Sequence, residues 1–356
     1  MKLALIAYLH GSGGAERQII LLANQMSVRG HETHLIVLCD NKSPYQIEPS
    51  VIVHDLSSLE DCGKLRILKR YCLFKKEMKR INPDTTINYN LQGAYFSLLA
   101  GKKFCGKILY SERGDPYDNE YSGLLGMVRD FICKHLDAFV FQSEGAKEFF
   151  HLSPKQKAIV IHNSVVVPQD KYPIPSARDN RIVTVGRLHP QKNPQLLVAA
   201  FALIADKYPD VTLEFYGDGA LKEEIQAKIY GLGLAERVHL HPSRKDIFDC
   251  IRKARLFVLT SDYEGMPNAL MEAMALGLPC VSTDCRPGGA RTLIESGKNG
   301  IIVPTRNVNA LAEKMMYMLD NPREAERMAH EAYKIGATHT NKVTFDRWNE
   351  FLMSVL

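Results

Sequence analysis

Two glutamates eight positions apart, Glu264 and Glu272, frame a predicted helix start in the second half of the chain. Pro267 suits the first turn of that helix, and the backbone amides of Asn268 and Ala269 follow it without helical partners. Helix starts attract anions because the peptide dipoles point their positive ends there. Since carboxylates accept hydrogen bonds from hydroxyls, this stretch predicts a ligand with hydroxyls and phosphate, such as a nucleotide sugar.

Two cations follow a predicted strand over residues 181–186. Arg187 lies at its carboxyl end, and Lys192 comes five residues later in a tight loop. An arginine offers a planar fork of donors and a lysine offers a point charge, which together suit a diphosphate. The alternative is an ordinary solvated pair of surface cations.

A glycine-rich turn, Gly11-Ser-Gly-Gly-Ala-Glu-Arg17, joins the first apolar run to a predicted helix. Such a turn lets backbone amides approach a phosphate closely. It also resembles the dinucleotide fingerprint G-x-G-x-x-G, with Asp40 at the end of the second strand as the ribose-binding acid. However, Glu16 occupies the third glycine position, where a carboxylate would crowd the helix against the strand. An NAD(P)-dependent dehydrogenase is therefore disfavoured.

The frame from Glu264 to Glu272 resembles the E-x7-E motif of the retaining GT-B glycosyltransferases of family 4. Gly11 to Arg17 and Val185-Gly-Arg-Leu-His-Pro-Gln-Lys-Asn193 match that family in the right order, and the resemblance covers nearly the whole chain. It implies a UDP-sugar donor and retention at the anomeric carbon. No D-x-D sequence occurs, so no metal cofactor is expected.

The resemblance also implies roles for particular residues. Catalytic roles are expected for Arg187, Lys192, Glu264 and Arg113. Donor binding is expected from Gly13, Gly14, Glu272, Asn268, Ala269, Gly265, Ser243, Arg244 and Gly217. Acceptor binding is expected from Glu16, Arg17 and Gly289.

Two positions depart from the family pattern. Many members carry a histidine at the position of Arg113, where it touches the transferring sugar. An arginine there suggests cationic stabilisation of the diphosphate or of a carboxylate-bearing partner. The alternative is a structural ion pair with Glu112 or Asp115. The second departure is a missing glycine near Ser243, in the loop expected to recognise the base.

Strands alternate with helices in both halves, which predicts an α/β chain of two Rossmann-like, doubly wound parallel sheets facing a cleft, the GT-B fold. Predicted strands cover residues 2–8, 31–38, 51–54, 84–89, 107–111, 138–142, 158–162, 181–186, 211–216, 238–240, 256–260, 279–283 and 300–303. We expect an acceptor domain over 1–166, a proline-rich linker over 167–180, a donor domain over 181–340 and a terminal helix over 341–356 that crosses back to the first domain.

The predicted helix 64–80 carries eight cations and the single acid Glu77. One interpretation is a packed helix with a solvated basic face. The other is a docking surface for anionic lipid or for a lipid-diphosphate acceptor, since clustered cations favour an anionic surface. Both interpretations stay open.

Composition bounds the class of protein. The 356 residues are 46% hydrophobic and 24% charged, with a net charge of +5, which is typical of a globular protein and too mild for a nucleic-acid binder. Eight scattered cysteines without a C-x-x-C pair indicate reduced thiols. No apolar run approaches the ~20 residues of a membrane span. We expect a cytoplasmic protein, peripheral on the inner face of the plasma membrane.

The function expected from these features is transfer of a hexose or N-acetylhexosamine from a UDP-sugar to a lipid-linked or polysaccharide acceptor, as in capsule or lipopolysaccharide synthesis. The frames around Glu264 and Gly289 resemble members that transfer N-acetylgalactosamine. Two alternatives remain: the dehydrogenase, and a catalytically inactive GT-B protein that binds a membrane or a partner transferase.

Overall fold

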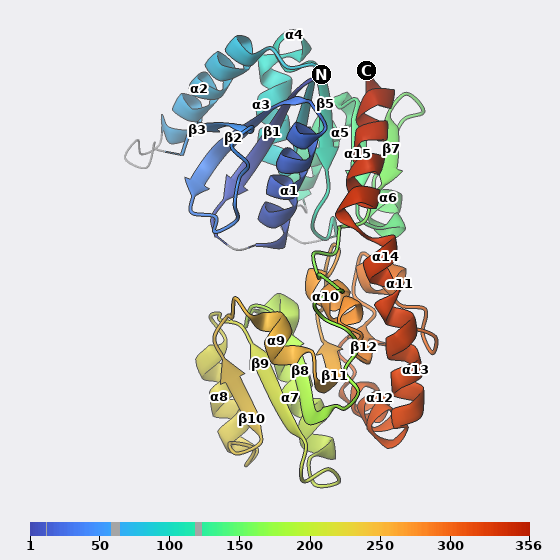
Figure 1. The fold of residues 1–356 in the computed structure, drawn as a ribbon. Helices are drawn as coiled ribbons and strands as arrows, with labels where there is room; N and C mark the ends of the chain where they lie inside the picture. Colours follow the sequence, from blue (N-terminus) through green and yellow to red (C-terminus); the bar gives the residue numbers. More distant parts are fainter. Residues whose placement is uncertain (12, 58–64, 118–122) are drawn as a thin grey trace. The chain divides into compact units, whose positions relative to one another are not determined.

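The computed structural model describes residues 1–11, 13–57, 65–117 and 123–356. This part of the chain divides into two compact units, each built on one parallel sheet (Figure 1). The first unit contains Met1–Asn163 and Lys342–Leu356, and the second contains Ser164–Asn341.

The sheet of the first unit has seven strands in the order β3-β2-β1-β4-β5-β6-β7. Its strands are β1 (Lys2–Leu9), β2 (Glu32–Asn41), β3 (Ile52–Asp55), β4 (Thr85–Asn88), β5 (Lys107–Ser111), β6 (Ala138–Phe141) and β7 (Lys157–Val160). Its helices are α1 (Gly14–Val28), α2 (Arg66–Ile81), α3 (Leu91–Ala100), α4 (Lys102–Cys105), α5 (Gly123–His135), α6 (Glu144–Phe149) and α15 (Asn341–Val355). The strand order reverses between β1 and β4, so the loops after these strands flank a topological switch point, where such sheets bind ligands.

Two apolar layers cover the faces of this sheet. On one face, α1 and α15 pack Ile19 and Trp348 against Leu5 of β1. On the other, α2 and α3 pack Phe74 and Phe96 in the core that contains Phe139 of β6. Because its aromatic side chains lie in the first of these cores, the terminal helix belongs to the first unit, as predicted.

The sheet of the second unit has six strands in the order β10-β9-β8-β11-β12-β13. Its strands are β8 (Asp179–Val185), β9 (Thr212–Tyr216), β10 (Val238–His241), β11 (Ala254–Leu259), β12 (Cys280–Thr283) and β13 (Ile301–Val303). Its helices are α7 (Pro194–Ile204), α8 (Lys222–Gly231), α9 (Ile247–Ile251), α10 (Asn268–Ala275), α11 (Gly289–Leu293), α12 (Val308–Asp320), α13 (Pro322–Tyr333) and α14 (Ile335–Thr338). The switch point lies between β8 and β11. All thirteen predicted strands occur, with ends within three residues of those predicted.

Residues 167–180, predicted as a linker, lie within the second unit. Val167 and Tyr172 belong to its apolar core. The Gln169 amide donates to the carbonyls of Ala275 at 3.1 Å and Tyr333 at 2.8 Å. This segment is therefore packed on the second unit and is not a free linker, and the division between the units falls after Asn163.

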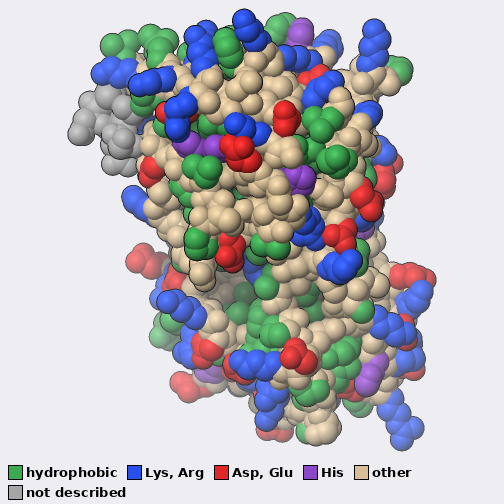
Figure 2. All heavy atoms as spheres, turned by 45° about the horizontal axis from the view of Figure 1, so that its top comes forward, with side chains coloured by type: hydrophobic (Ala, Val, Ile, Leu, Met, Phe, Trp, Pro, Cys, Tyr) green, Lys and Arg blue, Asp and Glu red, His purple; other side chains and the backbone are tan. Residues whose placement is uncertain are grey.

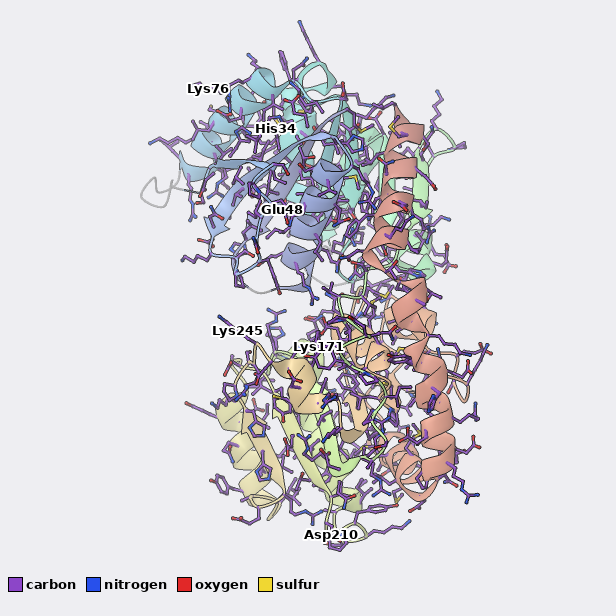
Figure 3. All side chains as sticks on the ribbon, in the orientation of Figure 1. His34, Glu48, Lys76, Lys171, Asp210 and Lys245 are labelled. Carbon is purple, nitrogen blue, oxygen red and sulfur yellow. The ribbon has the colours of Figure 1, made fainter. Side chains whose placement is uncertain are left out.

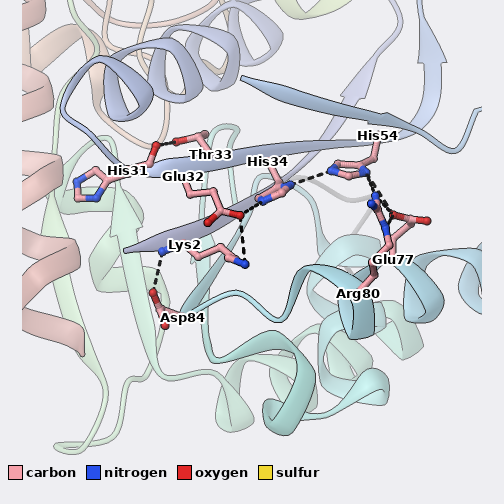
Figure 4. Close-up of polar contacts among 9 residues, drawn as sticks. All are labelled: Lys2, His31, Glu32, Thr33, His34, His54, Glu77, Arg80 and Asp84. Carbon is pink, nitrogen blue, oxygen red and sulfur yellow. Dashed lines mark hydrogen bonds and ion pairs between the residues drawn. The ribbon is translucent and has the colours of Figure 1, made fainter. Parts of the chain in front are cut away.

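A buried polar network connects α2 to β2 and β3 (Figure 4). His34 Nδ1 lies 2.9 Å from His54 Nε2, Glu32 Oε1 lies 3.1 Å from His34 Nε2, and Arg80 Nη2 lies 3.0 Å from His54 Nδ1. Glu77 accepts from Arg80 at 2.7 Å. Burial and the neighbouring His34 lower the pKa of His54. Since Arg80 is always a donor, His54 Nδ1 accepts from it, and the network connects the end of α2 to β2 and β3.

Candidate active site

In the second unit, Lys192, Glu264 and the start of α10 lie at the carboxyl ends of β8 and β11, whereas Gly217 follows β9, and Ser243 and Arg244 follow β10. Lys192 ends a short 3-10 helix (Pro190–Lys192) after β8, and Glu264 lies in the loop between β11 and α10. Lys192 Nζ forms an ion pair with Glu264 Oε1, and Ser261 Oγ donates to the same oxygen at 2.8 Å. The exposed fractions of the two side chains are only 22% and 9%. The predicted diphosphate-binding lysine and the predicted sugar-binding glutamate are thus direct partners.

Further hydrogen bonds fasten the two loops that carry this pair. Thr260 Oγ1 donates to the Lys192 carbonyl at 2.9 Å. Asn193 Nδ2 donates to Asp262 Oδ1 at 3.0 Å, and Gln191 Nε2 donates to the Tyr263 carbonyl at 3.0 Å. These positioning residues were missed from the sequence. For Ser261 a signal existed, because it precedes Glu264 by three residues in the same frame.

Arg187 differs from Lys192 in being exposed. Within the part of the chain that the structure describes, no carboxylate pairs with it. Together with Gly186 and Lys192 it lines a shallow depression at the end of β8. Its donors are therefore available to an anion, and its role toward the diphosphate stays a prediction.

Two of the predicted glycines have a packing reason for their identity. A Cβ on Gly217, whose φ is +150°, would lie 2.1 Å from the Gly186 carbonyl oxygen. A Cβ on Gly289 would lie 2.0 Å from the carbonyl oxygen of Gly265. The turn after β9 can therefore lie against the Arg187 loop, and the start of α11 against the Glu264 loop. Ligand contacts of Gly217, Gly265 and Gly289 stay predictions.

Helix α10 begins at Asn268, after Pro267, as predicted. Asn268, Ala269 and Glu272 are each partly exposed on its first turn and a half, whereas Leu270 and Met271 enter the core. The helix start, which follows the loop of Glu264, therefore presents amides and a carboxylate that are partly exposed. This arrangement suits phosphate and hydroxyl groups.

The predicted base-recognition residues Ser243 and Arg244 lie in the exposed loop after β10 that also carries Lys245 (Figure 3). Arg244 donates through Nε and Nη2 to Asp246 at 2.9 and 2.7 Å. The Ser243 amide donates to Asp218 at 2.9 Å, and this bond lowers the pKa of that carboxyl. Both residues have partners within the loop, and base recognition stays a prediction.

In the first unit, the glycine turn is closed by Glu16. Its carboxylate accepts from the amides of His10 at 3.1 Å and Gly11 at 2.9 Å. Gly13 caps α1, and Gly14 is its first residue. Because Glu16 folds back on the turn, it does not crowd α1 against β1, which corrects the reason given for disfavouring a dinucleotide site. The carboxylate instead occupies two amides of the turn. Arg17 is partly exposed on the next turn of the helix.

Arg113 follows β5 and has neutral partners. Its Nη2 donates to Tyr89 Oη at 2.7 Å and its Nη1 donates to Asn163 Oδ1 at 3.0 Å. The guanidinium lies over the rings of Tyr89 at 4.4 Å and Trp348 at 5.6 Å. Burial lowers the pKa of Arg113. Its Nε is buried without a hydrogen-bond partner.

The ion pair of Arg113 with Glu112 or Asp115, considered as the alternative, does not form in the described chain. Glu112 accepts instead from the amides of Arg113 at 2.9 Å and Gly114 at 2.8 Å, and from Tyr110 Oη at 2.9 Å. Its burial raises the pKa of this carboxyl. Among the described residues Arg113 is therefore a fixed cation that no carboxylate contacts directly, although the nearby charge of Glu112 partly opposes the lowering of its pKa.

Comparisons with known proteins agree with this picture. Residues 12–167 match the family model described as Glycosyltransferase Family 4, and residues 169–335 match the one described as Glycosyl transferases group 1. The chain is 29% identical, over 97% of its length and 96% of the relative, to the N-acetylgalactosamine-N,N'-diacetylbacillosaminyl-diphospho-undecaprenol 4-alpha-N-acetylgalactosaminyltransferase of Campylobacter jejuni.

Solved structures share the fold. The sucrose-phosphate synthase of Thermosynechococcus elongatus superposes with a TM-score of 0.83 at 17% identity, covering 99% of this chain and 98% of the other. Anabaena HepE in complex with UDP and glucose superposes with a TM-score of 0.80 at 19% identity, covering 99% and 100%. These likenesses confirm the predicted GT-B fold.

Proposed function

We propose that the chain is a glycosyltransferase of family 4, since both of its halves match glycosyltransferase family models. In this proposal it transfers a hexose or N-acetylhexosamine from a UDP-sugar to a hydroxyl of a lipid-linked or polysaccharide acceptor. The observation that carries the proposal is the Lys192–Glu264 pair beside the start of α10, with Arg187 exposed at the end of β8. Cations, a helix start and two carboxylates are the groups that a nucleoside-diphosphate sugar requires.

The diphosphate of the donor would take Lys192 and Arg187 as its cations. Since Lys192 is already bound to Glu264, donor binding exchanges one anion for another around the same ammonium group. Glu264 then becomes free to accept hydrogen bonds from sugar hydroxyls, and Glu272 accepts those of the ribose. Pre-positioned charge of this kind stabilises a departing diphosphate, and it needs no metal ion.

The transfer would retain the anomeric configuration. The acceptor oxygen bonds to the anomeric carbon on the face from which the β-phosphate oxygen leaves. As that carbon–oxygen bond breaks, the proton of the acceptor hydroxyl passes to the leaving phosphate oxygen. No side-chain nucleophile takes part, so the residues named above bind, orient and neutralise charge.

We propose N-acetylgalactosamine as the sugar and a polyprenyl-diphosphate-linked glycan as the acceptor. The name of the Campylobacter relative supports both, as do the sequence frames around Glu264 and Gly289. A lipid-linked acceptor would place the protein on the inner face of the membrane. The predicted basic surface of helix α2 is smaller than expected, because Arg70 is buried and Lys64 lies outside the described residues. The exposed cations of α2, which are Lys69, Lys76, Lys79 and Arg80, would meet anionic headgroups there, at about 1 kcal/mol for each cation near the surface.

A thermal-shift panel of UDP, GDP, ADP, NADH and NADPH tests the donor class. We expect UDP alone to raise the melting temperature of the wild type and to lose this effect in Glu272→Ala. Stabilisation by NADH or NADPH would instead indicate a dehydrogenase. UDP binding without sugar transfer to any lipid-linked acceptor would indicate an inactive binding protein.

A further inference from the structure

Helix α5 exposes more apolar surface than an ordinary surface helix, and one arginine lies on its buried side. The side that faces the sheet holds Gly126 and Arg129, with Ile132 and Cys133. Arg129 lies over the ring of Phe149 at 4.5 Å and pairs with Asp130 at 2.8 Å. A helix normally places such a residue in water and its apolar residues in the core. The buried side of α5 therefore includes a charged residue, Arg129.

The exposed side of α5 carries five apolar side chains beside Asp130, Lys134 and His135. We call these five side chains the α5 face, which consists of Leu124, Leu125, Met127, Val128 and Phe131. The exposed fractions of Leu124, Met127 and Phe131 are 74%, 69% and 62%. Single exposed apolar side chains are ordinary on proteins, but five on one helix of thirteen residues form a patch that marks an interaction surface.

The patch continues across the helix layer. Helix α3 packs beside α5 and also beside α2. It exposes Tyr95 and Leu99, and the first turn of α2 exposes Ile67 and Leu68. Apolar side chains from three neighbouring helices therefore face outward on the same side of the sheet, opposite the side covered by α1 and α15.

Cations accompany these apolar residues. Lys76, which Figure 3 labels on the outer side of α2, is exposed, as are Lys69, Lys79 and Lys103. Figure 2 shows Lys and Arg side chains mixed with hydrophobic ones along the upper rim of this unit. Apolar side chains flanked by cations complement a bilayer with anionic headgroups, because the two kinds of group meet the acyl boundary and the phosphates respectively.

We propose that the helix layer α2–α3–α5 is a membrane-insertion surface, in which the α5 face enters the headgroup region and the α2 and α4 lysines bind anionic headgroups. The inference rests on the proposed function in that a lipid-linked acceptor requires such contact. It goes beyond attachment by α2 alone, because it assigns the insertion to α5. No helix among the described residues is long and apolar enough to cross a bilayer, which fits attachment at one leaflet.

Flotation of the full chain with vesicles of phosphatidylethanolamine and phosphatidylglycerol tests the proposal. Salt near 1 M screens charge attraction beyond about 3 Å but leaves apolar insertion intact. The insertion variant replaces Leu124, Leu125, Val128 and Phe131 by Gln. The matched control replaces four equally exposed apolar residues elsewhere, Leu203, Tyr230, Leu232 and Met353, by Gln. The charge variant replaces Lys69, Lys76, Lys79 and Lys103 by Gln.

We expect the wild type and the control to float at low and high salt. The insertion variant should bind at low salt and lose at least about tenfold of its bound fraction at high salt. The charge variant keeps the α5 face, so its bound fraction at low salt should fall only to the level that the wild type shows at high salt. An insertion variant that floats like the control at high salt would overturn the proposal.

Two further measurements, light scattering and a UDP thermal shift, separate membrane insertion from dimer formation and from donor binding. Light scattering without vesicles would overturn the proposal if the wild type were a dimer and the insertion variant a monomer, since a second copy would then cover the α5 face. A UDP thermal shift on every variant separates the two proposals. If UDP did not bind the wild type, the donor assignment would be wrong but the flotation result would still hold. If UDP bound normally and the wild type did not float, only the insertion surface would be wrong.

Discussion

The two units hold their principal cations in opposite ways. In the second unit Lys192 is paired with the carboxylate of Glu264. In the first unit Arg113 is fixed between the rings of Tyr89 and Trp348 and donates only to neutral oxygens. A paired cation is stable but must release its partner before it neutralises a phosphate. A desolvated cation without a carboxylate in direct contact costs stability in the absence of ligand and is ready for an anion. The comparison suggests that donor binding exchanges ions whereas Arg113 is preorganised.

The largest expected effect comes from breaking the paired cation. Lys192→Met should lower sugar transfer by about 10²–10³-fold, the range for losing one pre-positioned charge. It should also lower the free energy of unfolding by about 3 kcal/mol, because Glu264 stays buried without its cation. Turnover assays and urea unfolding measure the two losses. The double variant Lys192→Met/Glu264→Gln should recover the stability without the activity. Failure to recover it would mean that the pair is not the cause.

Arg187 provides the contrasting case of an exposed cation. Arg187→Ala should reduce transfer by about 10²-fold, since its donors are the available fork beside Lys192. The free energy of unfolding should change by less than about 0.5 kcal/mol, because a surface residue without a carboxylate partner contributes little. Wild-type turnover in this variant would contradict the diphosphate assignment.

Arg113, the preorganised cation, should affect sugar transfer but hardly the free energy of unfolding. Arg113→Met should lower transfer by about tenfold or more, while the free energy of unfolding stays within about 1 kcal/mol of the wild type. An apolar side chain of similar length removes the desolvated charge and keeps contact with Tyr89 and Trp348. If Arg113→Met lost as much stability as Lys192→Met, the account of a cation without a carboxylate in direct contact would be wrong.

The smallest effect concerns pH and separates the two sheets. Burial lowers the pKa of His54 below its ordinary value of 6.5. The unfolded chain therefore takes up the proton first, so stability is complete above pH 6.5 and decreases as the pH falls toward the folded-state pKa. Hydrogen exchange should speed up in β2 and β3 between pH 7 and 5 more than in β8 and β9, after correction for intrinsic rates.

The control for the pH effect is His54→Gln, which keeps an acceptor for Arg80 and a donor for His34 but does not titrate. Its exchange in β2 and β3 should be much less sensitive to pH. Equal acid sensitivity of the variant and the wild type would assign the effect to Glu32, Glu77 or other groups around the pair.

Much of the fold follows from local patterns. Buried apolar runs separated by helical periodicity locate every described strand, and Pro267 marks the start of α10. The packing of residues 167–180 did not follow, because their prolines suggested a free linker while Val167 and Tyr172 enter the core. Composition indicates that a segment is irregular, but not what it packs against.

The site residues could be placed on their elements, but their partners could not be predicted. Lys192 and Glu264 lie 72 positions apart in the sequence, and only the order of β8 and β11 in the sheet brings their loops together. The surroundings of Arg113 come from Tyr89, Asn163 and Trp348, three distant segments. The α5 face was also missed, since periodicity alone does not tell which stripe of a helix faces the core.

Calorimetric titration with UDP tests the central claim most directly, on the wild type, Lys192→Met and Glu264→Gln. The exchange of ions predicts that UDP binds the wild type, binds Lys192→Met at least about tenfold more weakly, and binds Glu264→Gln at least as tightly as the wild type although that variant no longer transfers sugar. Equal UDP affinity of Lys192→Met and the wild type would contradict the assignment of Lys192 to the donor diphosphate.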